Sequence, residues 1–293
     1  MDHGLTEIVR RFNRTVTQRV GALDDRYLTR DRPLAQARLL WEIGPAGTEV
    51  VALRTRLDLD AGYLSRLLRA LEREGLVSVA AADGDARVRT ARLTDAGRAE
   101  WDALDRMSDE RAWSVLAPLS ESQRRRLTDA MAEVERLLVA SLVTIRPCHP
   151  GDPRARACLR AYGRELAGRF DGGFDPGRSG VDDEEMTPPN GLFLLATLST
   201  EAVGCGALRL RPDEPAEIKR VWVSESVRGL GVGRRLMGEL ERRTAAAGAD
   251  SVRLDTNRGL TEAIRLYRAL GYREIPAYNS NPYAHHWFGK TLR

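Results

Sequence analysis

The stretch from Ser224 to Arg243, SESVRGLGVGRRLMGELERR, directly follows the apolar run IKRVWV and governs how the second half of the chain is interpreted. Its three alternating glycines stand where a strand-like run gives way to an amphipathic helical pattern. Glycine lets the backbone approach a ligand without a side-chain clash, and the amides and dipole of a helix start attract phosphate. The stretch therefore predicts either a phosphate-binding turn or a glycine turn that only begins a helix.

The segments on either side of this stretch predict an α+β domain. Helical patterns cover DPRARACLRAYGRELAGRF and LTEAIRLYRALGY, and a long loop rich in Gly, Pro and acidic residues lies between the first helix and the second strand. The predicted strands are VTIRP, LFLLATLS, AVGCGALRLR, EIKRVWV, DSVRLDTN, REIPAYN and HHWFGKTL. Because the glycines follow the fourth strand, and no second strand–helix unit matches them, a dinucleotide-binding fold is not favoured.

This order of elements resembles the GNAT superfamily of acyl-CoA-dependent N-acetyltransferases. The resemblance rests on Arg228 to Gly233, which match the family's Arg/Gln-x-x-Gly-x-Gly/Ala element, on Asn257 after the fifth strand, and on Tyr267 and Gly271-Tyr272 beyond it. It covers residues 143–293. It implies a GNAT fold with a central mixed, mostly antiparallel sheet, and acetyl-CoA as the cofactor.

The resemblance also implies how the cofactor is held. Backbone amides of the glycine turn would bind the pyrophosphate of coenzyme A, the strand before it would pair with the pantetheine arm, and Asn257 would contact the pantetheine. The expected cofactor-binding residues are Val221, Trp222, Val223, Arg228, Gly229, Leu230, Gly231, Val232, Gly233, Arg234 and Asn257.

Two residues are the expected catalytic groups. Tyr267 would protonate the departing thiolate, because a phenol with a pKa of about 10 can serve as the acid for a thiol whose pKa is about 8.5. Glu217, on the strand before the glycine turn, is the candidate base that keeps the attacking amine unprotonated. The alternatives are that Tyr267 is only a packed core residue and that Glu217 is only a surface carboxylate.

The C-terminal stretch YNSNPYAHHWF predicts the acceptor pocket. Tyr278 and Asn281 are the expected substrate-contacting residues, and the expected acceptor is a small-molecule primary amine. His285 and His286 are adjacent on a predicted strand and face opposite sides of it, so they do not favour a shared metal ion. No metal site is expected.

The first half of the chain predicts short helices followed by a hairpin. One helix can start on Thr48, and the next, DAGYLSRLLRALEREG, can be capped by Asp60 and ended by Gly75. Its buried stripe is Leu64, Leu67, Leu68 and Leu71. The residues that point elsewhere offer cations for phosphates and donors for base edges: Tyr63, Ser65, Arg66 and Arg69.

Two strand-like runs flank Asp83-Gly84-Asp85, a strong turn signal, and Arg87 at the hairpin tip is suited to a minor groove. The segments LSRLLRALEREGLV and DARVRTARLTDAGR resemble the MarR family of winged helix-turn-helix regulators. The resemblance covers residues 5–142, with further helices at 95–117 and 121–142, the second capped by Ser120. It implies a mainly α domain that binds a pseudo-palindromic site on double-stranded DNA as a homodimer.

The whole chain has 293 residues, 42% of them hydrophobic, a formal net charge of +4 and a pI near 9.2. Its three cysteines show no paired spacing, and no segment reads as a signal peptide or membrane span, so the expected location is the cytoplasm. The expected domains are residues 1–142, which would bind DNA, and residues 143–293, which would be the acetyltransferase. The expected protein is therefore a bifunctional regulator and acetyltransferase. The alternatives are a second domain that only senses acyl-CoA and a first domain that only dimerises.

Overall fold

The computed structural model describes residues 2–20, 32–82, 85–179, 182–212 and 214–292. The chain divides into two compact units, Met1–Ala130 and Met131–Arg293. The division falls inside helix α6, Glu121–Ser141, and the expected domain boundary after residue 142 stays a prediction. None of the described helices combines the length and the apolar character that a membrane crossing needs.

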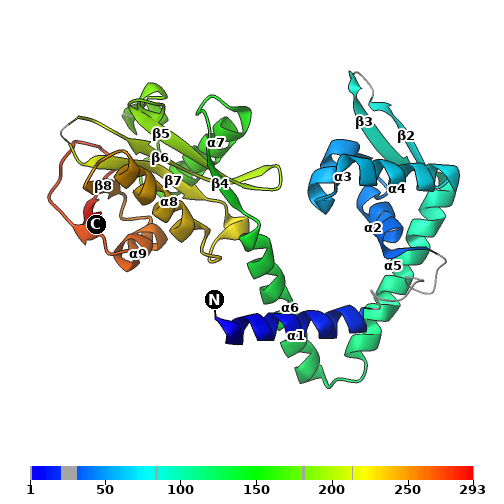
Figure 1. The fold of residues 1–293 in the computed structure, drawn as a ribbon. Helices are drawn as coiled ribbons and strands as arrows, with labels where there is room; N and C mark the ends of the chain where they lie inside the picture. Colours follow the sequence, from blue (N-terminus) through cyan, green and yellow to red (C-terminus); the bar gives the residue numbers. More distant parts are fainter. Residues whose placement is uncertain (1, 21–31, 83–84, 180–181, 213, 293) are drawn as a thin grey trace. The chain divides into compact units, whose positions relative to one another are not determined.

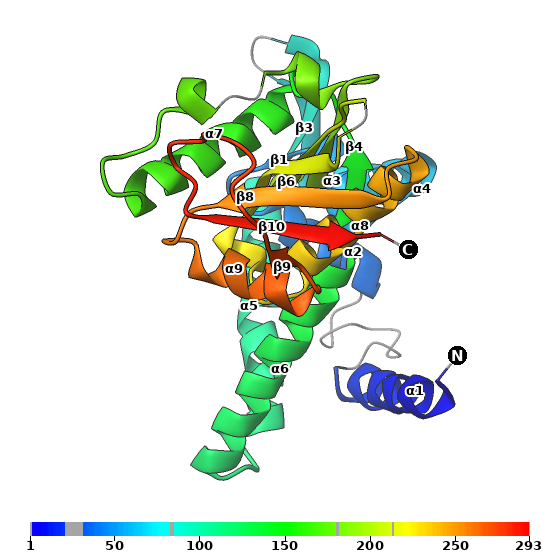
Figure 2. The same cartoon turned by 90° about the vertical axis from the view of Figure 1, so that its left-hand side faces the viewer.

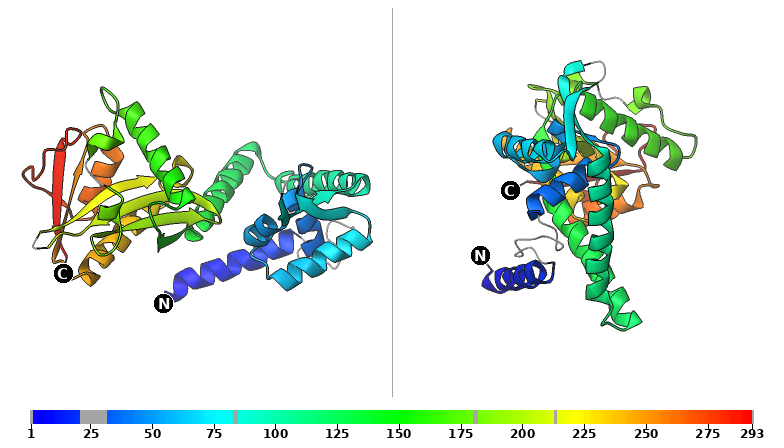
Figure 3. Two further views of the ribbon diagram at one scale, coloured as in Figure 1. Left: turned by 90° about the horizontal axis from the view of Figure 1, so that it is seen from above. Right: turned by 90° about the vertical axis from the view of Figure 1, so that its right-hand side faces the viewer.

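The first unit combines helices with a small sheet (Figures 1 and 3). Strand β3 lies at the centre of the sheet and pairs antiparallel with β1 and β2. The elements in chain order are α1 (His3–Arg19), α2 (Leu34–Ile43), β1 (Thr48–Glu49), α3 (Val50–Leu57), α4 (Ala61–Arg73), β2 (Val77–Ala82), β3 (Asp85–Leu93) and α5 (Asp95–Leu116).

Local sequence signals determine where several helices of this unit begin. The side chain of Asp60 accepts from the amide of Tyr63 at 2.9 Å and caps α4, as predicted, and the four predicted leucines of α4 are buried. Ser120 and Gln123 cap α6 reciprocally, each side chain accepting from the other residue's amide. The predicted hairpin strands are confirmed as β2 and β3, whereas the turn residues Asp83 and Gly84 lie outside the described residues.

Two features of this unit differ from the simplest reading of its sequence. The predicted helix start at Thr48 is wrong: Thr48 and Glu49 form β1, paired with Ala91 and Thr90 of β3, and α3 begins at Val50. Helix α1 has an amphipathic pattern, but none of its residues is buried within the described chain. Its apolar stripe remains exposed at Leu5, Ile8, Val9 and Phe12.

The second unit is built on a seven-stranded sheet in the order β4-β5-β6-β7-β8-β10-β9. All neighbouring pairs are antiparallel except β7 and β8, which confirms the predicted mixed, mostly antiparallel sheet. Its elements after α6 are β4 (Thr144–Pro147), α7 (Pro153–Arg169), η2 (Pro176–Ser179), η3 (Glu184–Met186), β5 (Gly191–Leu198), β6 (Glu201–Arg209), β7 (Ala216–Val223), η4 (Glu225–Val227), α8 (Val232–Ala246), β8 (Ser251–Thr256), α9 (Thr261–Ala269), β9 (Arg273–Glu274) and β10 (His286–Thr291).

Helices cover both faces of this sheet (Figure 2). On one face, α8 and α9 pack against β5, β7 and β8 through a cluster that includes Leu236, Leu240 and Tyr267. On the other face, α7 packs through Cys158 against side chains of β5 and β6, among them Phe193 and Cys205. Because side chains alternate along a strand, the neighbouring residues Leu194 and Phe193 of β5 point to opposite faces of the sheet and belong to different hydrophobic clusters.

The parallel pair β7 and β8 is joined only at its start. Ala216 and Glu217 pair with Val252 and Arg253, and no further residues of the two strands are paired in the described chain. Strand β7 continues to Val223, so from Ile218 onward its edge toward β8 has no strand partner among the described residues. The two strands therefore separate and leave a wedge in the sheet.

Candidate active site

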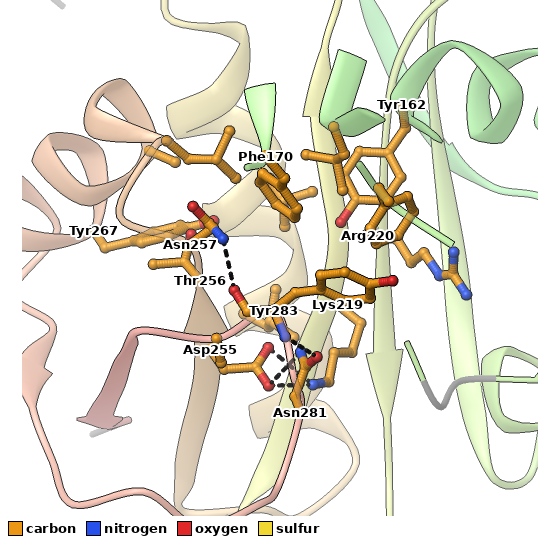
Figure 4. Close-up of a pocket in the computed structure, with 17 residues that line it drawn as sticks. Tyr162, Phe170, Lys219, Arg220, Asp255, Thr256, Asn257, Tyr267, Asn281 and Tyr283 are labelled. Carbon is orange, nitrogen blue, oxygen red and sulfur yellow. Dashed lines mark hydrogen bonds and ion pairs between the residues drawn. The ribbon is translucent and has the colours of Figure 1, made fainter. Parts of the chain in front are cut away.

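A pocket opens where β7 and β8 separate (Figure 4). It is lined by side chains from α7, β7, β8, α9 and the loop before β10. It brings together four residues singled out from the sequence, which are Val221, Asn257, Tyr267 and Asn281. The glycine turn, Glu217 and Tyr278 lie outside its lining.

The glycine turn presents a row of backbone donors at the start of α8. Gly229 and Gly231 have φ of +76° and +78°, a conformation that side-chain-bearing residues rarely adopt. A Cβ at Gly231 would meet no atom within 4 Å, so the space outside the turn is open. Within the described chain, the amides from Gly229 to Arg234 make no hydrogen bond to a protein acceptor. Such a row of unpaired amides suits an anion such as a pyrophosphate.

Side chains around the turn hold it in place. Trp222 Nε1 donates to Glu165 Oε2 of α7 at 2.7 Å, and the Arg228 guanidinium pairs with the same carboxylate. Arg228 also donates to the Val223 carbonyl at 2.9 Å, so its side chain is engaged within the fold. Arg235 donates to the carbonyls of Ala140 and Val143, whereas Arg234 is exposed. Leu230 and Val232 pack against an apolar cluster beside β4.

Tyr267 lies in the wall of the pocket on the face of the sheet that α8 and α9 cover. Its side chain is 5% exposed, and its ring centroid lies 6.0 Å from those of Tyr272 and Phe288. Burial raises the pKa of Tyr267 well above the usual value for a phenol. The group therefore keeps its proton at neutral pH and is available as a donor.

Asn257 is buried and spans two segments of the pocket. Its Nδ2 donates to the carbonyl of Tyr283 at 2.8 Å, and its Oδ1 accepts from the amide of Gly259 at 2.8 Å. Both interactions occur inside the fold, so Asn257 holds the loop before β10 against the turn after β8. The second hydrogen of Asn257 Nδ2 takes part in neither contact and can donate to a ligand.

Charged residues form a buried network on the opposite face of the sheet. Lys219 Nζ lies 2.7 Å from a carboxylate oxygen of Glu217 and 2.9 Å from one of Asp255. Glu217 is 2% exposed and also pairs with Arg209. Burial acts to raise the pKa values of Glu217 and Asp255, but Lys219 and the neighbouring donors outweigh it, so both pKa values lie below their usual range. Lys219 and Asp255 line the pocket.

The two predicted substrate-contacting residues belong to this network. Asn281 Nδ2 donates to Asp255 at 3.1 Å at the edge of the pocket. Tyr278 donates its hydroxyl proton to Glu217 at 2.9 Å, and burial, together with the nearby Asp255 and Glu217 carboxylates, raises its pKa. The structure therefore brings Asn281 to the pocket and directs Tyr278 toward Glu217.

Several pocket residues were missed in the sequence. Asp255 stands at an interior strand position, and a carboxylate there is a usable signal, because burying a charge is costly without a partner. The others are aromatic residues of α7 and the loop after it, Tyr162, Phe170 and Phe174. Their sequence neighbourhood carries no signal that distinguishes them from ordinary core aromatics.

The predicted DNA-binding residues lie in the first unit. Arg66 and Arg69 are exposed on α4, and the Arg66 guanidinium lies 5.6 Å from the centroid of the Tyr63 ring. Tyr63 packs against the leucine core of this unit, and Ser65 is half-buried. Arg87 belongs to β3, but its side chain lies outside the described residues.

Comparison with known proteins identifies one part of the chain. The model of the acetyltransferase (GNAT) family matches residues 161–272. An IAA acetyltransferase of Azospirillum brasilense is 34% identical over 95 residues, which are 32% of this chain and 62% of that protein. The chain thus spans less than two thirds of this relative.

Two further relatives extend the comparison. An uncharacterised HTH-type transcriptional regulator of Bacillus subtilis is 30% identical over 82 residues, 28% of this chain and 50% of that regulator. An uncharacterised N-acetyltransferase of Schizosaccharomyces pombe is 33% identical over 118 residues, 38% of this chain and 72% of that protein. With this relative and the matching family model, the chain belongs to the acetyltransferase (GNAT) family.

Proposed function

We propose that residues 143–293 transfer an acetyl group from acetyl-CoA to a small-molecule primary amine, which attacks the thioester directly. The observation that carries this proposal is the wedge between β7 and β8. On one side of it lies the edge of β7 that has no strand partner among the described residues, and its wall contains the buried phenol of Tyr267. An amine can approach such a wedge from one face of the sheet while the acid acts from the other.

The unpaired donors of the chain fit the two polar parts of coenzyme A. In this proposal the amides from Gly229 to Arg234 donate to the pyrophosphate, because none of them has a protein acceptor within the described chain. The edge of β7 toward β8, which has no strand partner from Ile218 to Val223 among the described residues, pairs with the amide groups of the pantetheine arm, as a strand would. Acetyl-CoA supplies the thioester that the amine attacks.

Tyr267 is the proposed acid. Burial keeps its phenol protonated, and no hydrogen bond within the described chain occupies its hydroxyl. A group in this state can give its proton to a thiolate and recover it from water.

The carboxylate facing the amine is Asp255 in our proposal, rather than the expected Glu217. Asp255 lines the pocket, whereas Glu217 lies outside the lining and is held between Arg209 and Lys219. Because Lys219 keeps Asp255 ionised, Asp255 accepts a hydrogen bond from the amine and directs it, and the amine proton passes to solvent. Glu217 is then a positioning residue that acts through Lys219.

We also propose that residues 1–142 form a MarR-like winged helix-turn-helix domain that binds double-stranded DNA as a homodimer. The order of α2, α3, α4 and the β2–β3 hairpin supports this, as do the exposed Arg66 and Arg69. The likeness to an HTH-type regulator points the same way. The exposed apolar stripe of α1 supports dimerisation, because contiguous apolar surface favours association.

The enzymatic part is tested by measuring thiol release from acetyl-CoA with the full-length protein and a panel of primary amines. Turnover with one class of amine, and an acetylated product of the expected mass, is the expected result. Calorimetric binding of acetyl-CoA without turnover of any amine would instead support a domain that only senses acyl-CoA. Absence of both binding and turnover would overturn the proposal.

The DNA-binding part is tested by selecting duplexes from a random pool. We expect enrichment of a pseudo-palindromic sequence, with half-sites about one helical turn apart. Replacing Arg66 and Arg69 by Ala should weaken binding and reduce its salt dependence, because fewer phosphate charges are neutralised. If a stable dimer selects no sequence, the first domain serves only for dimerisation.

A further inference from the structure

An aromatic wall closes one side of the active-site pocket. It consists of Tyr162 and Phe170 from α7 and its end, Phe174 from the following loop, and Tyr283 from the loop before β10, and all four line the pocket. The centroids of Phe174 and Tyr283 are 5.0 Å apart, and those of Phe170 and Tyr283 are 5.8 Å apart. The amide of Asp175 donates to the Tyr283 hydroxyl at 2.9 Å and joins the two loops.

A basic strip runs along α7 beside this wall. Arg156, Arg160 and Arg164 recur at four-residue spacing and therefore lie on one side of the helix. They line a second pocket, which shares Phe174 and Arg220 with the first. Arg156 pairs with Asp183, whereas Arg160 and Arg164 have no acidic partner among the residues that the structure describes. Arg160 and Arg164 therefore place uncompensated positive charge in the second pocket, which adjoins the first through Phe174 and Arg220.

The two adjoining pockets together offer three kinds of contact to one small molecule. Asp255 and Asn281 suit an amine, the aromatic wall suits a flat ring, and Arg160 and Arg164 suit a carboxylate. The same arginines disfavour acceptors with several positive charges, because the arginines, which have no acidic partner among the described residues, repel such acceptors.

We propose that the acceptor is an amine that carries both an aromatic ring and a carboxylate, as aromatic amino acids do. This inference rests on the proposed acetyl transfer. The amine nitrogen forms a bond to the acetyl carbon, the carbon–sulfur bond of the thioester breaks, and Tyr267 protonates the sulfur. The surplus proton of the amine goes to solvent, and the products are the N-acetyl amino acid and free coenzyme A.

Four acceptors separate the three contacts: phenylalanine, phenethylamine without the carboxylate, alanine without the ring, and the polyamine spermidine. We expect kcat/KM for phenylalanine to exceed that for each of the others by at least about tenfold. In the double variant Arg160→Gln/Arg164→Gln, the ratio of phenylalanine to phenethylamine should fall at least about fivefold. The control Arg154→Gln removes an exposed arginine of α7 that lines neither pocket and should preserve the ratio.

A binding measurement separates this inference from the proposed function. Calorimetry with 3-phenylpropionate, which has the ring and carboxylate but no amine, should show binding that the double variant weakens at least about fivefold. Turnover of phenethylamine or spermidine as efficient as that of phenylalanine would overturn the inference and leave the proposed acetyl transfer intact. If no amine is turned over, the proposed function fails, and the titration alone then decides whether the pocket recognises an aromatic carboxylate.

Discussion

Replacing Tyr267 by Phe tests the proposed acid with little disturbance of the fold. The ring would remain packed between Tyr272 and Phe288, and only a hydroxyl without a protein partner in the described chain would be lost. We therefore expect the free energy of unfolding to change by less than about 1 kcal/mol. General acids contribute roughly 10²- to 10⁴-fold to rate, so kcat should fall at least about 100-fold, which is about 2.7 kcal/mol in the barrier.

The assay is thiol release at saturating acetyl-CoA, with calorimetry to measure the affinity for acetyl-CoA in parallel. A loss confined to kcat indicates a group that acts in the transition state. Tyr272→Phe is the matched control, because Tyr272 is a neighbouring buried tyrosine that does not line the pocket. If Tyr267→Phe retains more than about half of the wild-type kcat, the proton comes from elsewhere and the assignment is wrong.

Three further predictions concern the glycine turn and the charged network. Gly231→Ala should cost about 1–2 kcal/mol of stability, because φ is +78° there although the space is open, and should weaken acetyl-CoA binding. The control Gly238→Ala lies inside α8 at an equally uncrowded position; it should stabilise the protein by up to about 1 kcal/mol and leave the affinity for acetyl-CoA unchanged. Thermal melts measure the stability of the two variants and calorimetry measures their affinity for acetyl-CoA. Equal effects of the two substitutions would contradict the role of the turn. Lys219→Met should cost about 3–5 kcal/mol in urea unfolding, because two buried carboxylates lose their shared cation, and a change below about 1 kcal/mol would refute this. The free energy of unfolding should be constant above about pH 5 and fall as the pH drops below about 4. The reason is that the pKa values of Glu217 and Asp255 are lower in the folded protein than in the unfolded chain, so the unfolded chain binds protons first. Urea titrations from pH 7 to pH 3 that show no loss of unfolding free energy would contradict this prediction.

Much of the fold could be predicted because its signals are local. The Asp60 and Ser120 caps and the leucine stripe of α4 depend on residues within one or two helical turns. The start of α3 could not be predicted in this way. Thr48 joins β3 through pairing with Ala91, more than forty residues away, and its helix-start signal is overridden.

The pocket could be predicted only along the segments with a recognisable pattern. Tyr267, Asn257 and Val221 lie together as their positions around the glycine turn indicated. The sequence favoured Glu217 as the base and missed Asp255, because which carboxylate reaches the pocket depends on how β7 and β8 separate. The aromatic wall depends on bringing Phe170 and Tyr283 together, and nothing in either segment predicts that packing.

The central claim is that acetyl-CoA binds to the glycine turn and to the edge of β7 toward β8. Amide hydrogen exchange of the full-length protein, with and without saturating acetyl-CoA, tests it directly. The amides from Gly229 to Arg234 have no protein acceptor in the described chain and should exchange rapidly in the free protein. With acetyl-CoA, we predict that exchange slows about tenfold or more in this turn and along Ile218–Val223. Binding of acetyl-CoA without protection of either segment would contradict the proposed site.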